Sequence, residues 1–282
     1  MKFFCRSLIF LLFLTACTQE KTSLDPAQAE EHYQRGIQFA LKSLTQNALD
    51  EFDLAIQLNP EHYNAYRKKG LVLFSLREYE KAKELFSFVV EKEPGNVQAL
   101  TNLGMANYVM GLKAESRKQW QRAISIHADD NDSKALNNLA NLYKEEKNFS
   151  EAIEYYEKAL LHEPENVLYT ANLGDSYRLD GNYGKAEEWL KKAVAIDPKG
   201  MLSYFQLGIL YHEQEKYDPA ITAFRHALEI NPSYVDASYH LAELYLAKND
   251  KPSAKKWVQQ ALAATPQNPR YQALASTIDA LK

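Results

Sequence analysis

Proline recurs at a fixed interval through most of this 282-residue sequence, and such a period restricts the chain to an array of one repeated structural motif. The spacing is 34 residues four times and 70 residues once, which is two intervals plus two residues. The prolines that set it are Pro60, Pro94, Pro164, Pro198, Pro232 and Pro266. Taking Pro60 as position 32 of its repeat divides residues 29–266 into seven repeats, with the two extra residues lying within 129–132. The repeats begin at Ala29, Tyr63, Val97, Ser133, Val167, Met201 and Val235.

Small and large side chains occupy fixed positions in these repeats. Position eight is always small: Gly36, Gly70, Gly104, Ala140, Gly174, Gly208 and Ala242. Position 24 is always apolar and mostly large: Phe52, Phe86, Trp120, Tyr156, Leu190, Phe224 and Val258. Residues three and four apart share one face of a helix, so positions four to eleven predict a first helix and positions 20 to 27 a second. Each repeat is therefore predicted to be a helical hairpin, in which small residues allow close helix approach and proline ends the second helix.

The small, aromatic and proline positions resemble the tetratricopeptide repeat (TPR) family over residues 29–266. The resemblance implies an all-α fold, a right-handed superhelical solenoid of seven TPR hairpins. Ala128 replaces the proline of the third repeat, and we expect this change and the following insertion to alter the stacking there. Residues 267–282 place Tyr271, Leu274 and Ile278 at helical spacing, which predicts a capping helix over the last repeat.

The first 16 residues have the pattern of a secretory signal peptide, with a basic leader before an apolar run that ends at Leu14. The run is shorter than the roughly 20 apolar residues that a membrane-spanning helix needs. Residues 14–17, Leu-Thr-Ala-Cys, resemble the bacterial lipobox. The resemblance implies that Cys17 carries acyl chains such as palmitate and becomes the N-terminus after cleavage. The alternative is an ordinary secretory signal with an incidental cysteine.

An anchored N-terminus has consequences for location. In lipoproteins of double-membraned bacteria, Asp after the lipidated cysteine favours the inner membrane, whereas this sequence has Thr18. By resemblance we expect an outer-membrane protein that faces the periplasm, held stably because it carries more than one acyl chain. Residues 17–28 lack an apolar period and contain Pro26, so they are predicted to be the lipidated cysteine and a flexible tether.

The sequence contains no motif of an enzyme or of a bound cofactor. It lacks a Gly-rich phosphate loop, an HExxH motif and a GxSxG elbow, and its two cysteines, Cys5 and Cys17, cannot build a structural site in the repeats. His212 and His240 fall on first helices of adjacent repeats, where solvated histidines are common. We therefore expect no enzymatic activity, metal, cofactor or small-molecule substrate. The formal charge of −4 also argues against nucleic-acid binding.

Function is expected on the first-helix face opposite the hairpin contacts, which lines the groove in the TPR family. Position six is an amide in five of seven repeats, and an amide can donate and accept hydrogen bonds from an extended peptide. The alternative is that these amides are typical of the family and remain solvated. The predicted partner-binding residues are Gln34, Arg67, Phe74, Asn102, Tyr108, Lys134, Asn138, Asn141, Asn172, Arg178, Gln206 and Tyr239.

Three of these residues, Arg67, Asn102 and Lys134, resemble part of the carboxylate clamp with which some TPR proteins hold a C-terminus. Leu71 and Asn138 replace two other clamp residues, so the clamp is incomplete. The sequence as a whole predicts a membrane-anchored scaffold or adaptor that binds a protein or peptide partner. Assembly of pilus or secretion machinery, the regulation of cell-wall hydrolases or synthases, and an enzyme with an unrecognised site are the alternatives, in decreasing order of preference.

Overall fold

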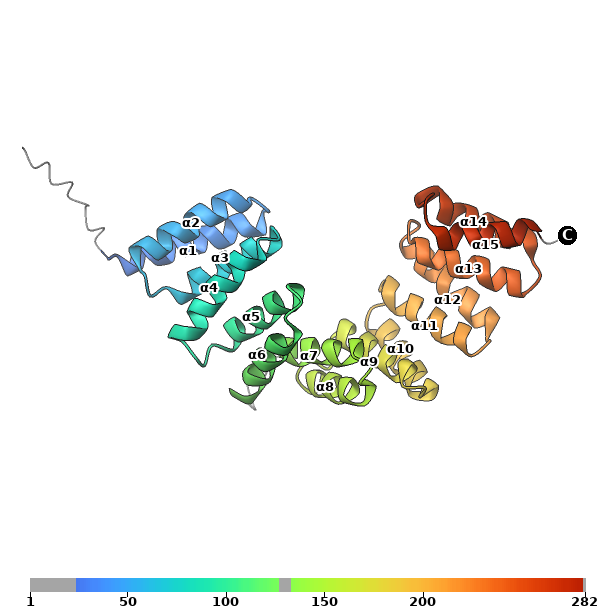
Figure 1. The fold of residues 1–282 in the computed structure, drawn as a ribbon, viewed down its shortest axis with the longest axis horizontal. Helices are drawn as coiled ribbons and strands as arrows, with labels where there is room; N and C mark the ends of the chain where they lie inside the picture. The colour runs from blue at the N-terminus through green and yellow to red at the C-terminus, as the bar shows by residue number, and fades with distance from the viewer. Residues whose placement is uncertain (1–23, 127–132, 281–282) are drawn as a thin grey trace, which may run out of the picture. The chain divides into compact units, whose positions relative to one another are not determined.

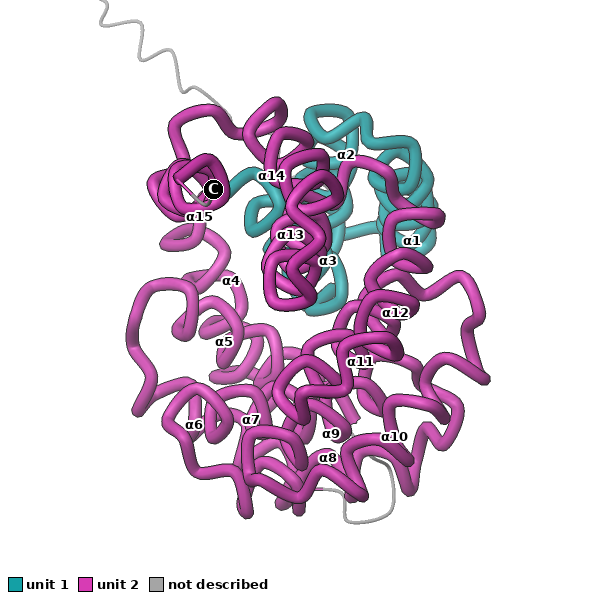
Figure 2. The backbone as a smooth tube through the Cα atoms, turned by 90° about the vertical axis from the view of Figure 1, so that its right-hand side faces the viewer, with its two compact units in different colours: residues 1–77 teal, residues 78–282 magenta. Residues whose placement is uncertain are grey.

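The structure, a computed structural model, describes residues 24–126 and 133–280. Helices account for all regular secondary structure in these two ranges (Figure 1). The chain divides into two compact units, residues 1–77 and 78–282 (Figure 2). The predicted lipidation site Cys17 and the insertion at 129–132, with Ala128 before it, lie outside the described residues. The prediction of an all-α TPR solenoid is confirmed for the described residues.

The described residues of unit 1 form three helices: α1 (Pro26–Leu41), α2 (Thr45–Leu58) and α3 (Tyr63–Ser75). Helices α1 and α2 form a hairpin, and α3 packs against α2. Gly36 of α1 faces the buried ring of Phe52, and a Cβ atom built at Gly36 would lie 2.6 Å from Cε1 of that ring. The absence of a side chain therefore brings the two helices together, as positions eight and 24 predict.

Helix α1 begins earlier than the sequence analysis expected. Residues 26–28 were assigned to the tether, but they form the first turn of the helix. The Asp25 carboxylate accepts hydrogen bonds from the backbone N–H groups of Ala27 and Gln28, and Pro26 occupies the first turn, where its missing N–H costs nothing. The tether prediction is wrong for these residues because an N-cap signal was overlooked.

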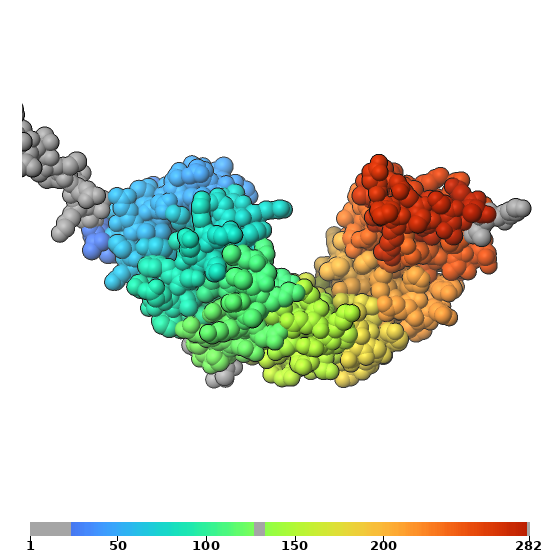
Figure 3. All heavy atoms as spheres, in the orientation of Figure 1, coloured from blue at the N-terminus to red at the C-terminus, as the bar shows by residue number. Residues whose placement is uncertain are grey.

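Unit 2 contains twelve helices within its described residues. They are α4 (Tyr79–Lys92), α5 (Val97–Val109), α6 (Lys113–Ile126), α7 (Ser133–Glu145), α8 (Phe149–His162), α9 (Val167–Leu179), α10 (Tyr183–Ile196), α11 (Met201–Glu213), α12 (Tyr217–Ile230), α13 (Val235–Ala247), α14 (Lys251–Ala264) and α15 (Pro269–Ala280). Five hairpins, from α5/α6 to α13/α14, stack in chain order, and α15 packs on α14 and α13 (Figures 1 and 3).

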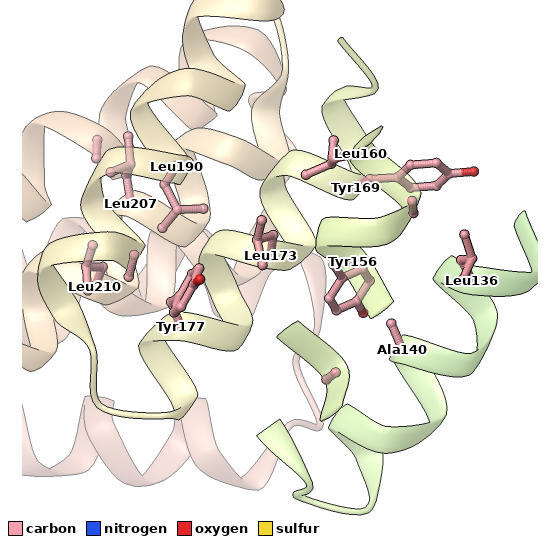
Figure 4. Close-up of a cluster of buried hydrophobic side chains, with 14 residues drawn as sticks. Leu136, Ala140, Tyr156, Leu160, Tyr169, Leu173, Tyr177, Leu190, Leu207 and Leu210 are labelled. Atoms are coloured by element: carbon pink, nitrogen blue, oxygen red, sulfur yellow. The ribbon is translucent and has the colours of Figure 1, made fainter. Parts of the chain in front are cut away.

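The core of unit 2 runs continuously between hairpins. A Cβ atom at Gly208 would lie 2.5 Å from Cε1 of the buried Phe224, which repeats the contact at Gly36. One cluster joins α7 to α12 through Tyr156, Leu173 and Leu190, which are fully buried (Figure 4). Removing a buried aromatic side chain of this kind typically costs about 3–5 kcal/mol. Packing against both neighbouring hairpins thus stabilises each repeat.

The first helices of the repeats end with a left-handed residue at position 15. It is glycine in two repeats, Gly111 and Gly181, with φ of 80° and 81°. The other repeats use residues with a Cβ atom: Ser43, Arg77, Lys147, Glu215 and Asn249. At Gly181 the N–H bonds to the carbonyl of Arg178, and the next N–H, of Asn182, bonds to that of Tyr177. This is a Schellman cap, which turns the chain toward the second helix.

Candidate functional site

The candidate site lies on the first helices of unit 2, α5, α7, α9, α11 and α13. We call the surface formed by positions six, nine and twelve of these helices the groove face. Side chains link each of these helices to the next: Tyr108 to Glu145, Asn172 to Asn137 and Arg178 to Glu213. His212 of α11 and His240 of α13 complete the series, with ring centroids 6.0 Å apart. The groove face is therefore continuous through unit 2.

A pocket of about 540 Å³ opens on the groove face between α5 and α7. Its lining mixes apolar and polar groups: Met105, Tyr108, Trp120, Asn138, Asn141, Lys144 and Glu145. Three of the predicted site residues, Tyr108, Asn138 and Asn141, line this pocket. Glu145 and Lys144 were not among the predicted partner-binding residues.

Hydrogen bonds fix the walls of this pocket. The Tyr108 hydroxyl donates to Oε2 of Glu145 at 2.8 Å, and Nζ of Lys113 donates to Oε1 at 2.5 Å. Both hydrogen bonds lower the pKa of the Glu145 carboxyl, and the bond from Lys113 has the larger effect. On the opposite wall Tyr156 donates to Oδ1 of Asn141 at 2.5 Å, and burial raises the pKa of Tyr156. These hydrogen bonds fix the positions of Tyr108, Asn141 and Glu145 in the pocket lining.

Amides at position six are incompletely satisfied. Nδ2 of Asn102, Nδ2 of Asn138 and Oε1 of Gln206 are buried atoms for which the described part of the chain provides no hydrogen-bond partner. A buried polar atom left without a partner costs about 1–3 kcal/mol. Two donors and one acceptor along the groove face therefore lack a hydrogen-bond partner within the described residues.

Asn172 differs from the other position-six amides. Only 8% of the residue is exposed, and its Nδ2 donates to Oδ1 of Asn137 on α7 at 3.4 Å. This hydrogen bond joins the first helices α7 and α9. Asn137 lies at position five of its repeat, beside the predicted stripe. Asn172 thus already has a partner within the chain, and its contact with a partner protein stays a prediction.

The middle of the groove face carries a network of charges. Asp175 on α9 pairs with Nζ of Lys144 at 3.2 Å and with the Arg178 guanidinium at 2.7 Å. Arg178 reaches on to Glu213 of α11 at 2.5 Å, and its side chain is only 13% exposed. The sequence selected Arg178 for partner contact, but its guanidinium already pairs with two carboxylates. Lys134, at the start of α7, remains exposed.

Tyr239 is covered by the capping helix. Its residue exposure is 6%, its ring centroid lies 5.1 Å from that of Tyr271 on α15, and the Arg270 guanidinium lies 4.1 Å from the ring centre. The ring therefore belongs to the core between α13 and α15. Partner contact by Tyr239 stays a prediction, and the repeat pattern could not show that side chains of α15 cover this ring.

Three predicted site residues belong to unit 1. Gln34 is exposed and its Nε2 donates to Oε1 of Glu30 at 2.7 Å. Arg67 is buried, with one guanidinium nitrogen 3.2 Å from Oδ1 of Asn64, and Phe74 is half-buried. The groove face as defined in unit 2 does not include them. The partial clamp of Arg67, Asn102 and Lys134 stays a prediction.

Models of the tetratricopeptide repeat family match residues 67–132, 133–166, 165–233 and 211–278. Together these matches cover most of the chain, which belongs to the tetratricopeptide repeat family. Human tetratricopeptide repeat protein 6 is 29% identical over 143 residues, which are 51% of this chain and 27% of the human protein. The chain thus spans about a quarter of that relative's length. In the described ranges, every helix is too short or too polar to cross a membrane.

Solved structures share the fold. The pilF protein of Pseudomonas aeruginosa superposes with a TM-score of 0.66 at 19% identity, covering 77% of this chain and 98% of that one. PilW, described as a type IV pilus biogenesis factor, superposes with a TM-score of 0.70 at 18% identity, covering 76% of this chain and 98% of that one. At these identities the likeness establishes the TPR solenoid and nothing about partners.

Proposed function

We propose that the protein is a non-catalytic scaffold that holds an extended segment of a partner protein on the groove face. The observation that carries the proposal is the pair of buried, unpartnered Nδ2 groups of Asn138, which lines the pocket between α5 and α7, and of Asn102, three residues before Met105 on α5. Carbonyl oxygens of an extended peptide would accept these two hydrogen bonds. The apolar side chains of Met105 and Tyr108 would receive an apolar side chain of the same segment.

The proposal includes an anchor at Cys17. It is supported by the lipobox-like residues 14–17 after a short apolar run. Two or more acyl chains at about 0.8 kcal/mol per buried methylene would hold the protein on its membrane. Thr18 in place of Asp favours the outer membrane, with the repeats in the periplasm.

Assembly of envelope machinery such as a pilus is the setting we propose for the scaffold. It is supported by the combination of lipobox-like residues with a TPR body, and by the appearance of PilW, a type IV pilus biogenesis factor, and of pilF among the structures with this fold. The groove face contributes binding groups and no arrangement of a nucleophile with a base, which is why a scaffold role is preferred over catalysis.

The binding surface can be tested by photocrosslinking in cells. A benzophenone amino acid in place of Met105 should form adducts with a protein partner, because this residue lines the pocket. The same substitution at Leu161, which is 77% exposed on α8, is the control. Adducts from Leu161 and none from Met105 would move the partner to the second helices and overturn the proposal.

The amides can be tested with the partner so identified. Asn102→Ala with Asn138→Ala should weaken binding about tenfold or more, because two hydrogen bonds of about 0.5–1.5 kcal/mol each are lost. The free protein should unfold at the same or a higher temperature, because the change removes two buried unsatisfied groups. Asn47→Ala, at an exposed site on α2, is the control. Unchanged affinity in the double variant would refute the role of the amides.

The anchor has its own experiment. Cys17→Ser should abolish incorporation of labelled fatty acid and release the protein from membranes, because the thioether requires sulfur. Cys5→Ser should leave both unchanged. Label retained in the Cys17 variant would disprove the anchor without affecting the groove.

A further inference from the structure

Two histidines and a glutamate meet on the groove face at the C-terminal end of unit 2. His212 is at position twelve on α11, and His240 and Glu243 are at positions six and nine on α13. One potential ligand atom from each residue lies within 4.8 Å of those of the other two. In the part of the chain that the structure describes, this is the one group of three such residues with that spacing.

The three side chains are held in place by their surroundings. Residues three apart on a helix share a face, and Nδ1 of His240 lies 2.9 Å from Oε2 of Glu243. The His240 ring stacks on the buried Phe224 ring, with centroids 5.3 Å apart and an interplanar angle of 10°. His212 approaches from the preceding repeat, with its ring at 77° to that of His240. All three residues are partly buried, so each retains access to an ion from the groove.

We propose that His212, His240 and Glu243 bind a divalent transition-metal ion such as Zn²⁺. Imidazole nitrogen with one carboxylate oxygen is a donor set suited to these ions, and two histidines with one glutamate leave a fourth position for water. Ligands at about 2.0–2.2 Å from Zn²⁺ lie about 3.3–3.6 Å apart in a tetrahedron. The observed separations therefore require side-chain shifts of about an ångström and no movement of the helices.

The charges around the cluster also favour a cation. Glu243 is itself a carboxylate within the cluster. Glu213 is the other carboxylate that acts electrostatically on His212. The opposing group is Arg270 of α15, whose guanidinium lies 4.0 Å from Oε1 of Glu243. Its side chain is 56% exposed, so it can turn toward solvent when an ion binds.

This proposal is independent of the scaffold function, and it revises the expectation that the repeats hold no metal. The sequence placed both histidines on adjacent first helices but gave no reason for them to face one another. Glu243 was not considered because carboxylates are frequent throughout the chain, which has 37. The contact between α11 and α13 side chains supplies the missing information.

Titration of the chelator-treated, full-length protein with Zn²⁺ tests the proposal by calorimetry. His240→Asn restores the amide found at position six in other repeats, and His212→Asn is its counterpart on α11. Each should weaken Zn²⁺ binding about 10- to 100-fold or more while leaving the helical circular dichroism unchanged. Arg270→Ala should strengthen binding, because it removes the cation nearest to Glu243.

His226→Asn is the matched control. His226 and Glu229 have the same spacing as His240 and Glu243, with Nδ1 and Oε2 3.0 Å apart, but they are exposed on α12 and belong to no such group of three. Both cysteines are kept in every variant, so any thiol binding is common to all. Co²⁺ absorption in the visible range reports coordination by the same residues. Zn²⁺ binding that is absent from the wild type, or that survives both histidine substitutions, would overturn the proposal.

Discussion

The left-handed residue at position 15 allows a quantitative test of how the hairpins are closed. Gly181 follows α9 with φ of +81°, whereas Gly184 lies three residues later in the first turn of α10. A Cβ atom added at either glycine would meet no other atom within 4 Å. Replacing each by alanine therefore isolates backbone conformation from packing.

The two substitutions should have opposite effects. In the left-handed region an alanine costs about 1–2 kcal/mol, and the reduced entropy of the unfolded chain returns about 0.4–1 kcal/mol. Gly181→Ala should therefore lower the free energy of unfolding by up to about 1.6 kcal/mol, with a midpoint of about 0.8 kcal/mol. Gly184→Ala incurs no such strain and should raise it by about 0.4–1 kcal/mol.

Thermal and urea unfolding of the two variants provide the measurement. For a chain of this size, 1 kcal/mol corresponds to about 2–4 °C in Tm, so the variants should differ by several degrees. Glu215→Gly is the converse change, at a non-glycine residue with φ of 58°, and should not destabilise the chain as a helix-interior glycine would. Equal effects of Gly181→Ala and Gly184→Ala would show that the cap conformation does not limit stability.

Two further substitutions test the packing and the titration of unit 2. Ala186→Leu, at a fully buried site of α10, should lower the free energy of unfolding by about 1–3 kcal/mol. Ala195→Leu, at an exposed site of the same helix, should lower it little. A thermal unfolding experiment that ranks the two variants the other way would refute the assigned hairpin contact. Burial lowers the pKa of His212 in the folded protein, with His240 acting in the same direction and Glu243 opposing it. As the pH falls, His212 of the unfolded chain is protonated before His212 of the folded protein. The stability that neutral His212 contributes is therefore fully present above about pH 6.5 and is lost as the pH falls toward the folded pKa. His212→Asn should flatten the decline in stability below about pH 6.5. An unchanged slope in urea unfolding would contradict this.

Repeat spacing determined the contacts inside the hairpins. Small residues at position eight and large ones at position 24 led to the contacts of Gly36 with Phe52 and Gly208 with Phe224. These pairs could be predicted because the two positions are 16 residues apart within one motif, and the same complementarity recurs along the chain. The helix start at Pro26 was missed, although the cap formed by Asp25 is also local and could have been read from the sequence.

The composition of the groove could be predicted only in part. Helical periodicity placed Asn102, Asn138 and Asn172 on one stripe, but it could not show that Asn172 bonds to Asn137 while the other two keep a free donor. It also could not show that Arg178 is neutralised by Asp175 and Glu213. Such pairings depend on how adjacent first helices are offset, which no single repeat specifies.

The sequence by itself determined the hairpins, their order and the residues that face away from the hairpin contacts, because these follow from spacings within a helix or a single repeat. Tertiary structure decided which of those residues remain available to a ligand. Tyr239 is covered by α15, and His212 is brought to His240 and Glu243, because side chains about 30 residues apart meet only when neighbouring repeats stack at a particular offset. That offset is set by the summed packing of whole helices, to which each residue contributes a small part.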